Sequence, residues 1–227
     1  SPLPIYASGL NPGRSAYDTV GRMRAAGYRA FKIKVGFGTE TDLDTLRPVA
    51  RELKGGERLM VDVNQGWDLR TACATVPKLA EFGLGWIEEP LMADRPVTEW
   101  TQVAAVAPTQ LAGGENLRNA GPFQEVIDSG LFGVIQPDAA KWGGHSGCLP
   151  VARAALAAGR SYCPHFLGGA IGLMHSLHLL AAVRGPGLLE VDANPNPLRE
   201  GLLGDLMTAR EGTVSLPGGQ GLGLEPD

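Results

Sequence analysis

Three acidic residues recur at almost equal intervals along this chain, and each follows a short apolar run. They are Asp62, Glu88 and Glu115, which stand 26 and 27 residues apart. An apolar run that leads into an acid and a glycine-containing break is typical of a buried strand at its end. The interval accommodates one strand, one helix and two loops. The spacing therefore predicts strand–helix units that present carboxylates at one end of a parallel sheet.

The remaining sequence continues this alternation. Strands are expected at 5–8, 29–35, up to 62, up to 88, up to 115, and at 131–136, 161–163 and 188–191. Helices are expected at 15–26, 39–55, 69–82, 97–106, from 122, and at 147–158 and 171–183. Eight units of even length favour an α/β fold of the (β/α)8 (TIM) barrel type over an open doubly wound sheet. We expect residues 1–195 to form the barrel and the Gly- and Pro-rich residues 196–227 to be an irregular tail, packed on its outside or on a missing partner.

Composition excludes several classes of protein. The 227 residues are 44% hydrophobic, which is enough for a full core, and the net charge is −4 without a basic cluster. Nucleic acid and membranes are therefore not expected partners, and no apolar run is long enough to span a bilayer. The three cysteines have no CxxC spacing, which is typical of reduced thiols in a cytoplasmic protein. The opening Ser1-Pro2-Leu3-Pro4 reads as an interdomain linker, so we expect a preceding segment.

The three acids are candidate metal ligands. Any one of them alone would more often cap a helix or lie in a surface loop. Together, at matched strand ends, Asp62, Glu88 and Glu115 offer only oxygen donors, which suit a hard cation, Mg²⁺ before Mn²⁺. Strand alternation places Glu88 on the face of Trp86 and Glu89 on the other face, so Glu88 is the preferred ligand.

Candidate bases flank this set. In Phe31-Lys32-Ile33-Lys34-Val35 the lysines share one parity, and in a buried parallel strand they would point into the barrel. A lysine crowded by a second lysine and a metal favours its neutral form, so it could act as a base. Asp138 and His165 end consecutive strands, and the acid could orient the imidazole. We expect this pair to lie across the barrel from Lys34.

Other polar residues are weaker candidates. Glu190 ends the eighth strand. Its side chain could either donate a hydrogen bond to a substrate carboxylate, if protonated, or form a salt bridge. His175 and His178 stand three residues apart on an expected outer helix. Packing or a surface position is a better interpretation than joint coordination of a metal ion. The glycine-rich segment 168–172 is either a tight turn or a phosphate-binding loop.

Several linked motifs resemble the enolase superfamily, in the order and spacing of its mandelate racemase/muconate lactonizing enzyme branch. The motifs are Lys32-x-Lys34, Asp62-x-Asn64, Ile87-Glu88-Glu89-Pro90, Gly114-Glu115-Asn116, the run from Pro137-Asp138 to Gly144, and Pro164-His165-Phe166. The resemblance implies Mg²⁺ on the three acids, Lys34 as one base and the His165–Asp138 dyad as the other. Asp138, where the muconate-lactonizing type carries lysine, makes the chain more similar to the mandelate-racemase-like group. The segment Leu188 to Asp192 looks like that of sugar-acid dehydratases.

The resemblance also implies an activity and a second domain. We expect Mg²⁺-dependent abstraction of the proton α to a carboxylate through an enediolate that the metal and Lys32 stabilise, with dehydration of a sugar or hydroxy acid favoured over racemisation, epimerisation or cycloisomerisation. The family carries an α+β capping domain before the barrel, which this chain lacks, and it tends to form homo-oligomers. The candidate substrate contacts are Asn64, Lys141, Tyr6 and Trp142.

Two other classes remain open at this point. A phosphosugar enzyme would use the glycine segment after the seventh strand and would not need three acids on consecutive strands. A non-enzymatic barrel that binds a ligand or regulates a partner would not need both bases.

Overall fold

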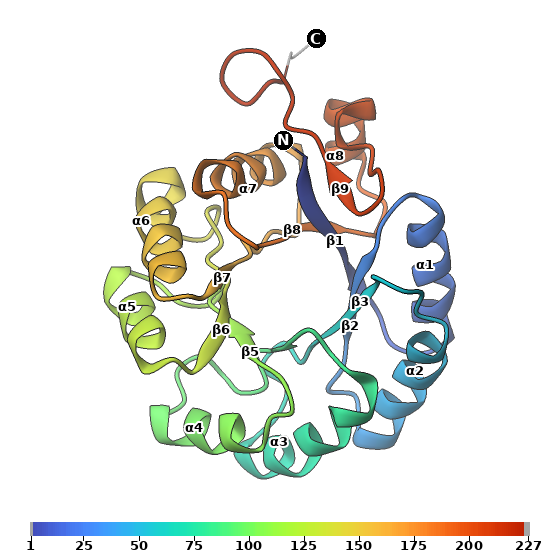
Figure 1. Cartoon of the computed structure of the whole chain (residues 1–227), viewed down its shortest axis with the longest axis vertical. Coiled ribbons are helices and arrows are strands. Elements are labelled where there is room, and N and C mark those ends of the chain that lie inside the picture. Colours follow the sequence, from blue (N-terminus) through green and yellow to red (C-terminus); the bar gives the residue numbers. More distant parts are fainter. Residues whose placement is uncertain (1, 225–227) are drawn as a thin grey trace.

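The computed structural model describes residues 2–224, in which strands and helices alternate along the chain (Figure 1). The strands are β1 Leu3–Leu10, β2 Ala30–Lys34, β3 Arg58–Asp62, β4 Ile87–Glu88, β5 Leu111–Gly113, β6 Phe132–Ile135, β7 Ser161–Tyr162, β8 Leu189–Asp192 and β9 Thr213–Val214. The α-helices are α1 Arg14–Ala25, α2 Thr39–Arg51, α3 Leu69–Thr75, α4 Val97–Val106, α5 Ala120–Ser129, α6 Gly144–Ala157, α7 Ala170–Val183 and α8 Pro197–Leu203. Two 3-10 helices lie at Val76–Phe82 and Gly204–Met207.

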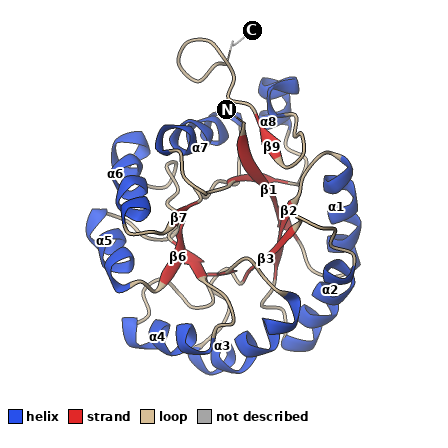
Figure 2. Ribbon diagram, viewed as in Figure 1, coloured by secondary structure: helices blue, strands red, loops and turns tan. Residues whose placement is uncertain are grey.

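The strands form one curled sheet with the helices on its outer side (Figure 2). Strands β1 to β8 run parallel in the order β7-β6-β5-β4-β3-β2-β1-β8. The two edges of this order also lie side by side: the Leu188 N–H donates to Cys163 Sγ over 3.3 Å. A side chain at Gly187 would overlap the carbonyl of Tyr162, so only glycine permits this approach. The predicted α/β fold with a curled parallel sheet is confirmed.

The two faces of the sheet bury different sets of residues. Outward-facing side chains such as Phe31, Ile33 and Val61 join the helices in one large core. A second, smaller cluster fills the inside of the curl with about one residue from each strand or its immediate flank. We call this set the plug; its members are Tyr6, Ala30, Met60, Trp86, Ala112, Val134, Cys163 and Leu188. Alternation along the strands thus places every residue two positions after a plug residue on the same inner side.

Two sequence expectations about the elements are wrong. The helix expected over 69–82 is divided, because its second half, which begins at Val76 and Pro77, forms a 3-10 helix. The tail after 195 is not irregular throughout. Asn196 caps α8 by accepting the Leu198 N–H, Pro197 begins that helix, and β9 pairs antiparallel with Leu3 and Pro4 of β1.

Across residues 2–224, every helix is too short or too polar to cross a lipid bilayer.

Candidate active site

A layer of polar side chains lies directly above the plug, at the carboxyl ends of the strands. Each member stands two residues after a plug residue, and all are buried despite their polarity. We call this set the polar layer; its members are Ser8, Lys32, Asp62, Glu88, Gln136, His165 and Glu190. Buried charges are stable only when they are paired, so the contacts among these groups define what the site can do.

Lys32 is the cation at the centre of the carboxylates. Its Nζ lies 2.5 Å from Glu88 Oε1, 2.8 Å from Glu190 Oε1 and 3.6 Å from Asp62 Oδ2. Burial lowers the pKa of Lys32, but Glu190 and Glu88 outweigh it and hold the pKa well above its ordinary value. Carboxylates rather than Lys34 dominate the surroundings of Lys32, which suits its expected role as a fixed positive charge beside the substrate rather than as a base.

The carboxylates exceed the cations in this layer. Burial is the largest cause of the raised pKa of Glu88, and Asp62 and Glu190 add to it, so that its pKa reaches about 8 although Lys32 opposes the shift. Glu88 Oε2 also accepts hydrogen bonds from Trp86 Nε1 at 2.9 Å and Gln136 Nε2 at 2.7 Å. The bond from Trp86 confirms that Trp86 and Glu88 share the inner face.

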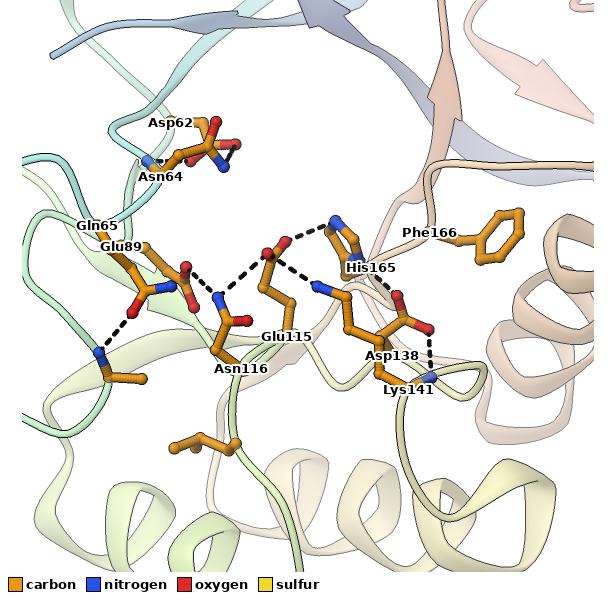
Figure 3. A network of polar contacts seen from close by, with 12 residues as sticks. Asp62, Asn64, Gln65, Glu89, Glu115, Asn116, Asp138, Lys141, His165 and Phe166 are labelled. Carbon is orange, nitrogen blue, oxygen red and sulfur yellow. Dashed lines mark hydrogen bonds and ion pairs between the residues drawn. The ribbon is translucent and has the colours of Figure 1, made fainter. Parts of the chain in front are cut away.

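Asp138 and His165 meet as predicted, and His165 also contacts Glu115 (Figure 3). Asp138 Oδ2 lies 2.8 Å from His165 Nδ1, and Glu115 Oε2 lies 2.5 Å from His165 Nε2. Burial lowers the pKa of His165, but Glu190, Asp138 and Glu115 together raise it to about 10. In this arrangement the imidazole is held in its charged form, with a defined acceptor at each nitrogen.

The turn after β4 contains a carboxylate, that of Glu89, whose direction strand alternation predicts wrongly. Glu89 follows Glu88, but its φ of 38° turns the chain, and its side chain is buried. Asn116 Nδ2 donates hydrogen bonds to Glu89 Oε2 at 2.8 Å and to Glu115 Oε1 at 3.2 Å. Figure 3 shows Glu89, Asn116 and Glu115 in one chain of contacts. Gln65, also at positive φ, donates its N–H to the Glu89 carbonyl over 2.8 Å. A left-handed backbone cannot be read from alternation, although strain of this kind is frequent at functional sites.

Lys34 and Glu190 take different positions in the site. Lys34 ends β2 beside Asp62, and among residues 2–224 its ammonium has no hydrogen bond or ion pair in this structure. Lys34 is the last residue of β2, and His165 follows β7 by three residues; these two strands are not neighbours in the sheet order and stand on opposite sides of the ring in Figure 1. Glu190 forms an ion pair with Lys32, so of its two expected roles the structure shows the salt bridge. Glu190 also accepts a hydrogen bond from the Phe166 N–H at 3.0 Å.

The four candidate substrate contacts divide into two groups. Asn64 bonds Asp62 through its side chain at 3.1 Å, and Lys141 Nζ lies 3.1 Å from Glu115 Oε1, so both belong to the carboxylate network. Tyr6 is fully buried in the plug against Trp86, and Trp142 packs against Phe123 with ring centroids 5.4 Å apart. The structure thus places Tyr6 and Trp142 in hydrophobic packing.

The three predicted metal ligands do not converge in this structure. Within the described part of the chain, no three His, Cys, Asp or Glu side chains form a group that could hold a metal ion. Lys32 lies against both Asp62 and Glu88, and Glu115 pairs with His165 and Lys141. The donor set nevertheless fits Mg²⁺ in chemistry, since it is all oxygen and carries more negative charge than its neighbours neutralise.

Comparisons with known proteins agree with this fold. The family model for the enolase C-terminal domain-like fold matches residues 16–227. D-galactarolactone cycloisomerase from Agrobacterium fabrum is 31% identical over 210 residues, which are 89% of this chain and 55% of that protein.

Two solved structures share the fold over the whole chain. A mandelate racemase/muconate lactonizing enzyme from Bordetella bronchiseptica RB50 is 51% identical, with a TM-score of 0.95 and coverage of 63% of that chain. An L-talarate/galactarate dehydratase variant with Mg and L-glucarate is 29% identical, with a TM-score of 0.86 and coverage of 56% of that chain. The chain thus spans little more than half the length of these relatives. It belongs to the mandelate racemase/muconate lactonizing enzyme family of the enolase superfamily.

Proposed function

We propose that the chain is the (β/α)8-barrel catalytic part of a Mg²⁺-dependent enzyme that removes the proton α to a carboxylate. One observation carries this proposal: β2, which ends at Lys34, and β7, which precedes the Asp138-bound His165, stand on opposite sides of the ring whose inside holds the polar layer. Two groups that exchange protons from opposite faces of one carbon atom are what abstraction at one face and delivery at the other require.

In this proposal Asp62, Glu88 and Glu115 would hold the metal ion, with Mn²⁺ as a substitute for Mg²⁺. Mg²⁺, when bound, supplies positive charge that opposes the negative charge developing on the substrate carboxylate. Lys34 takes the α-proton, and Lys32 adds a fixed positive charge beside the carboxylate of the substrate. Asp138 holds the orientation of His165, which delivers a proton to the substrate or to a leaving hydroxyl group. Glu190 keeps Lys32 and the segment at Phe166 in place.

Dehydration of a sugar or hydroxy acid is the favoured outcome. An imidazole held in its charged form suits protonation of a departing hydroxyl, and the relatives named above include a sugar-acid dehydratase and a cycloisomerase of a sugar lactone. Racemisation, epimerisation or cycloisomerisation is the alternative within the same chemistry.

The whole protein's organisation is part of the proposal. We propose that a separate α+β capping domain, as in longer members of the family, closes over the polar layer, with residues 196–227 packed on the barrel or on that domain. A cytoplasmic homo-oligomer is the assembly that we expect.

The test is exchange of the α-proton with solvent. Sugar acids and hydroxy acids are incubated with the chain and MgCl₂ in D₂O, and loss of the α-proton signal is followed by NMR. Lys34→Ala and His165→Asn are expected to reduce exchange by at least about 10²-fold, because each removes a general acid or base. The exposed Lys78→Ala and the half-buried His178→Asn are matched controls that should retain it. Exchange that survives in both test variants would refute the two-base scheme, and turnover of a phosphorylated substrate without Mg²⁺ would favour the phosphosugar alternative.

A further inference from the structure

Two histidines that the proposed chemistry does not use face each other across neighbouring helices. His145 lies in the first turn of α6 and His175 in the second turn of α7, and Figure 1 shows these helices next to each other on the outside of the ring. His145 Nε2 lies 2.9 Å from His175 Nδ1, and the ring centroids are 4.6 Å apart at an interplanar angle of 78°. The two nitrogen atoms are thus in direct contact, and His145 Nε2 also lies 3.2 Å from the His175 carbonyl oxygen.

This pairing replaces the one that sequence spacing suggests. His175 and His178 stand three residues apart on α7, but His178 Nε2 lies 3.3 Å from the carbonyl oxygen of Leu222 and is directed at the tail. The partner of His175 comes instead from α6, 30 residues earlier. Only the packing of the two helices reveals it.

We propose that His145 and His175 form a binding site for a borderline divalent metal ion such as Zn²⁺, Ni²⁺ or Cu²⁺. Zn–N bonds of about 2.0–2.1 Å at a tetrahedral angle place two ligand nitrogens about 3.3 Å apart. The observed separation of 2.9 Å is therefore about 0.4 Å short of that value, which small side-chain rotations supply. The ring that now donates shifts its proton to its other nitrogen, so its tautomer changes and no proton is lost.

The surroundings suit such an ion. His145 is exposed and His175 is half-buried, so an ion can reach the pair from solvent. Burial, His145 and His178 lower the pKa of His175, which leaves its lone pair available at neutral pH. Because no third His, Cys, Asp or Glu joins the pair within residues 2–224, water would complete the coordination. Nitrogen donors favour these ions over Mg²⁺, so the site is chemically separate from the carboxylate layer.

A metal ion at this position would join two functional loops. Helix α6 begins at Gly144, just after the loop that carries Asp138, and α7 begins at Ala170, just after the loop that carries His165. A bond between the two helices therefore holds these loops at a fixed spacing. Binding to the folded state also stabilises it in proportion to the logarithm of metal concentration.

The experiment titrates Zn²⁺ into the full chain in a large excess of MgCl₂, with binding measured by calorimetry and the Tm by scanning fluorimetry. We expect one site of micromolar affinity and a rise in Tm. His145→Ala should weaken binding roughly 10²-fold, the smaller end of the gain from a second tethered ligand. His178→Ala, a histidine of the same helix, is the matched control and should leave binding unchanged.

A spectroscopic readout keeps the assignment independent of affinity. Electron paramagnetic resonance of bound Cu²⁺ should show two imidazole nitrogens in the unmodified chain and one in His145→Ala or His175→Ala. Absence of a saturable site in the unmodified chain would overturn the proposal. Equal weakening by His178→Ala and His145→Ala would overturn the assignment to this pair. Neither result depends on whether α-proton exchange occurs.

Discussion

The inside of the curled sheet holds two consecutive layers of equally buried residues with opposite chemistry. The plug contains apolar and aromatic side chains, among them Met60 and Trp86 at 0% and 3% exposure. Two residues further along the same strands, Asp62 and Glu88 of the polar layer are 3% and 1% exposed. The strands give both layers the same backbone geometry. The difference between an apolar layer and a charged layer therefore comes from the side chains alone.

The difference explains how the chain tolerates so many buried charges. The plug and the outer core supply apolar burial, which is the dominant favourable contribution to folding. The polar layer depends instead on mutual pairing, and the raised pKa of Glu88 shows that the pairing is incomplete. A lower layer of apolar residues therefore supports an upper layer of buried charges.

The largest effect on stability is expected from Lys32→Met. This change leaves Glu88, Glu190 and Asp62 without their shared buried cation, which should reduce the free energy of unfolding by about 3–5 kcal/mol in metal-free buffer. Urea denaturation in EDTA measures it, with the exposed Lys78→Met as control. A loss below about 1 kcal/mol would show that the polar layer does not depend on pairing.

Met60→Ala tests the plug at the neighbouring layer. Met60 is fully buried, and its truncation should cost about 3 kcal/mol through lost burial and the cavity left behind. Unlike the loss in Lys32→Met, this cost should not change with pH or with MgCl₂, since no charge is involved. Denaturation curves at several pH values, with and without MgCl₂, measure this cost. A cost that varied with pH or MgCl₂ would contradict the assignment of Met60 to a layer that depends on apolar burial alone.

The pH dependence of stability should come from the polar layer. The pKa of His165 is about 10 in the folded chain against an ordinary 6.5, so its contribution is complete below pH 6.5 and is lost as pH rises through 10. In EDTA the free energy of unfolding should fall by about 1 kcal/mol between pH 7 and pH 8. Glu88, whose pKa is about 8, adds a fall of the same sign over this range, so His165→Asn should reduce the fall by about 1 kcal/mol without abolishing it; an unchanged fall in the variant would assign it to other groups.

The smallest effect is expected where the two layers meet. The Tyr6 hydroxyl is fully buried and has no hydrogen-bond partner among the described residues. Tyr6→Phe should therefore raise the free energy of unfolding by up to about 1 kcal/mol, because it removes an unsatisfied polar group and keeps the ring. Thermal denaturation measures this change, and a clear loss of stability would reveal a partner for the hydroxyl.

Sequence periodicity predicts the layers well but not their contacts. The two-residue alternation places Lys32, Asp62 and Glu88 on the inner side because period and burial are local properties of a strand. It misassigns Glu89, whose positive φ lies outside the strand geometry. It also cannot show that Lys32 contacts both Asp62 and Glu88, since such pairing depends on side chains from different strands.

The tail and the outer helices show the same limit. The composition of residues 196–227 resembles a loop, yet β9 exists because Thr213 and Val214 find a partner in β1. The His145–His175 pair likewise depends on the packing of α6 against α7. Local sequence predicts the elements, and only tertiary contacts determine which residues meet.

Calorimetric titration of Mg²⁺ into the metal-free chain tests the central claim most directly. If Asp62, Glu88 and Glu115 form a metal site, the unmodified chain binds Mg²⁺ at a single site, and Asp62→Asn and Glu115→Gln each weaken binding by about tenfold or more. Absence of binding in the unmodified chain, or the same affinity in both variants, would contradict the claim.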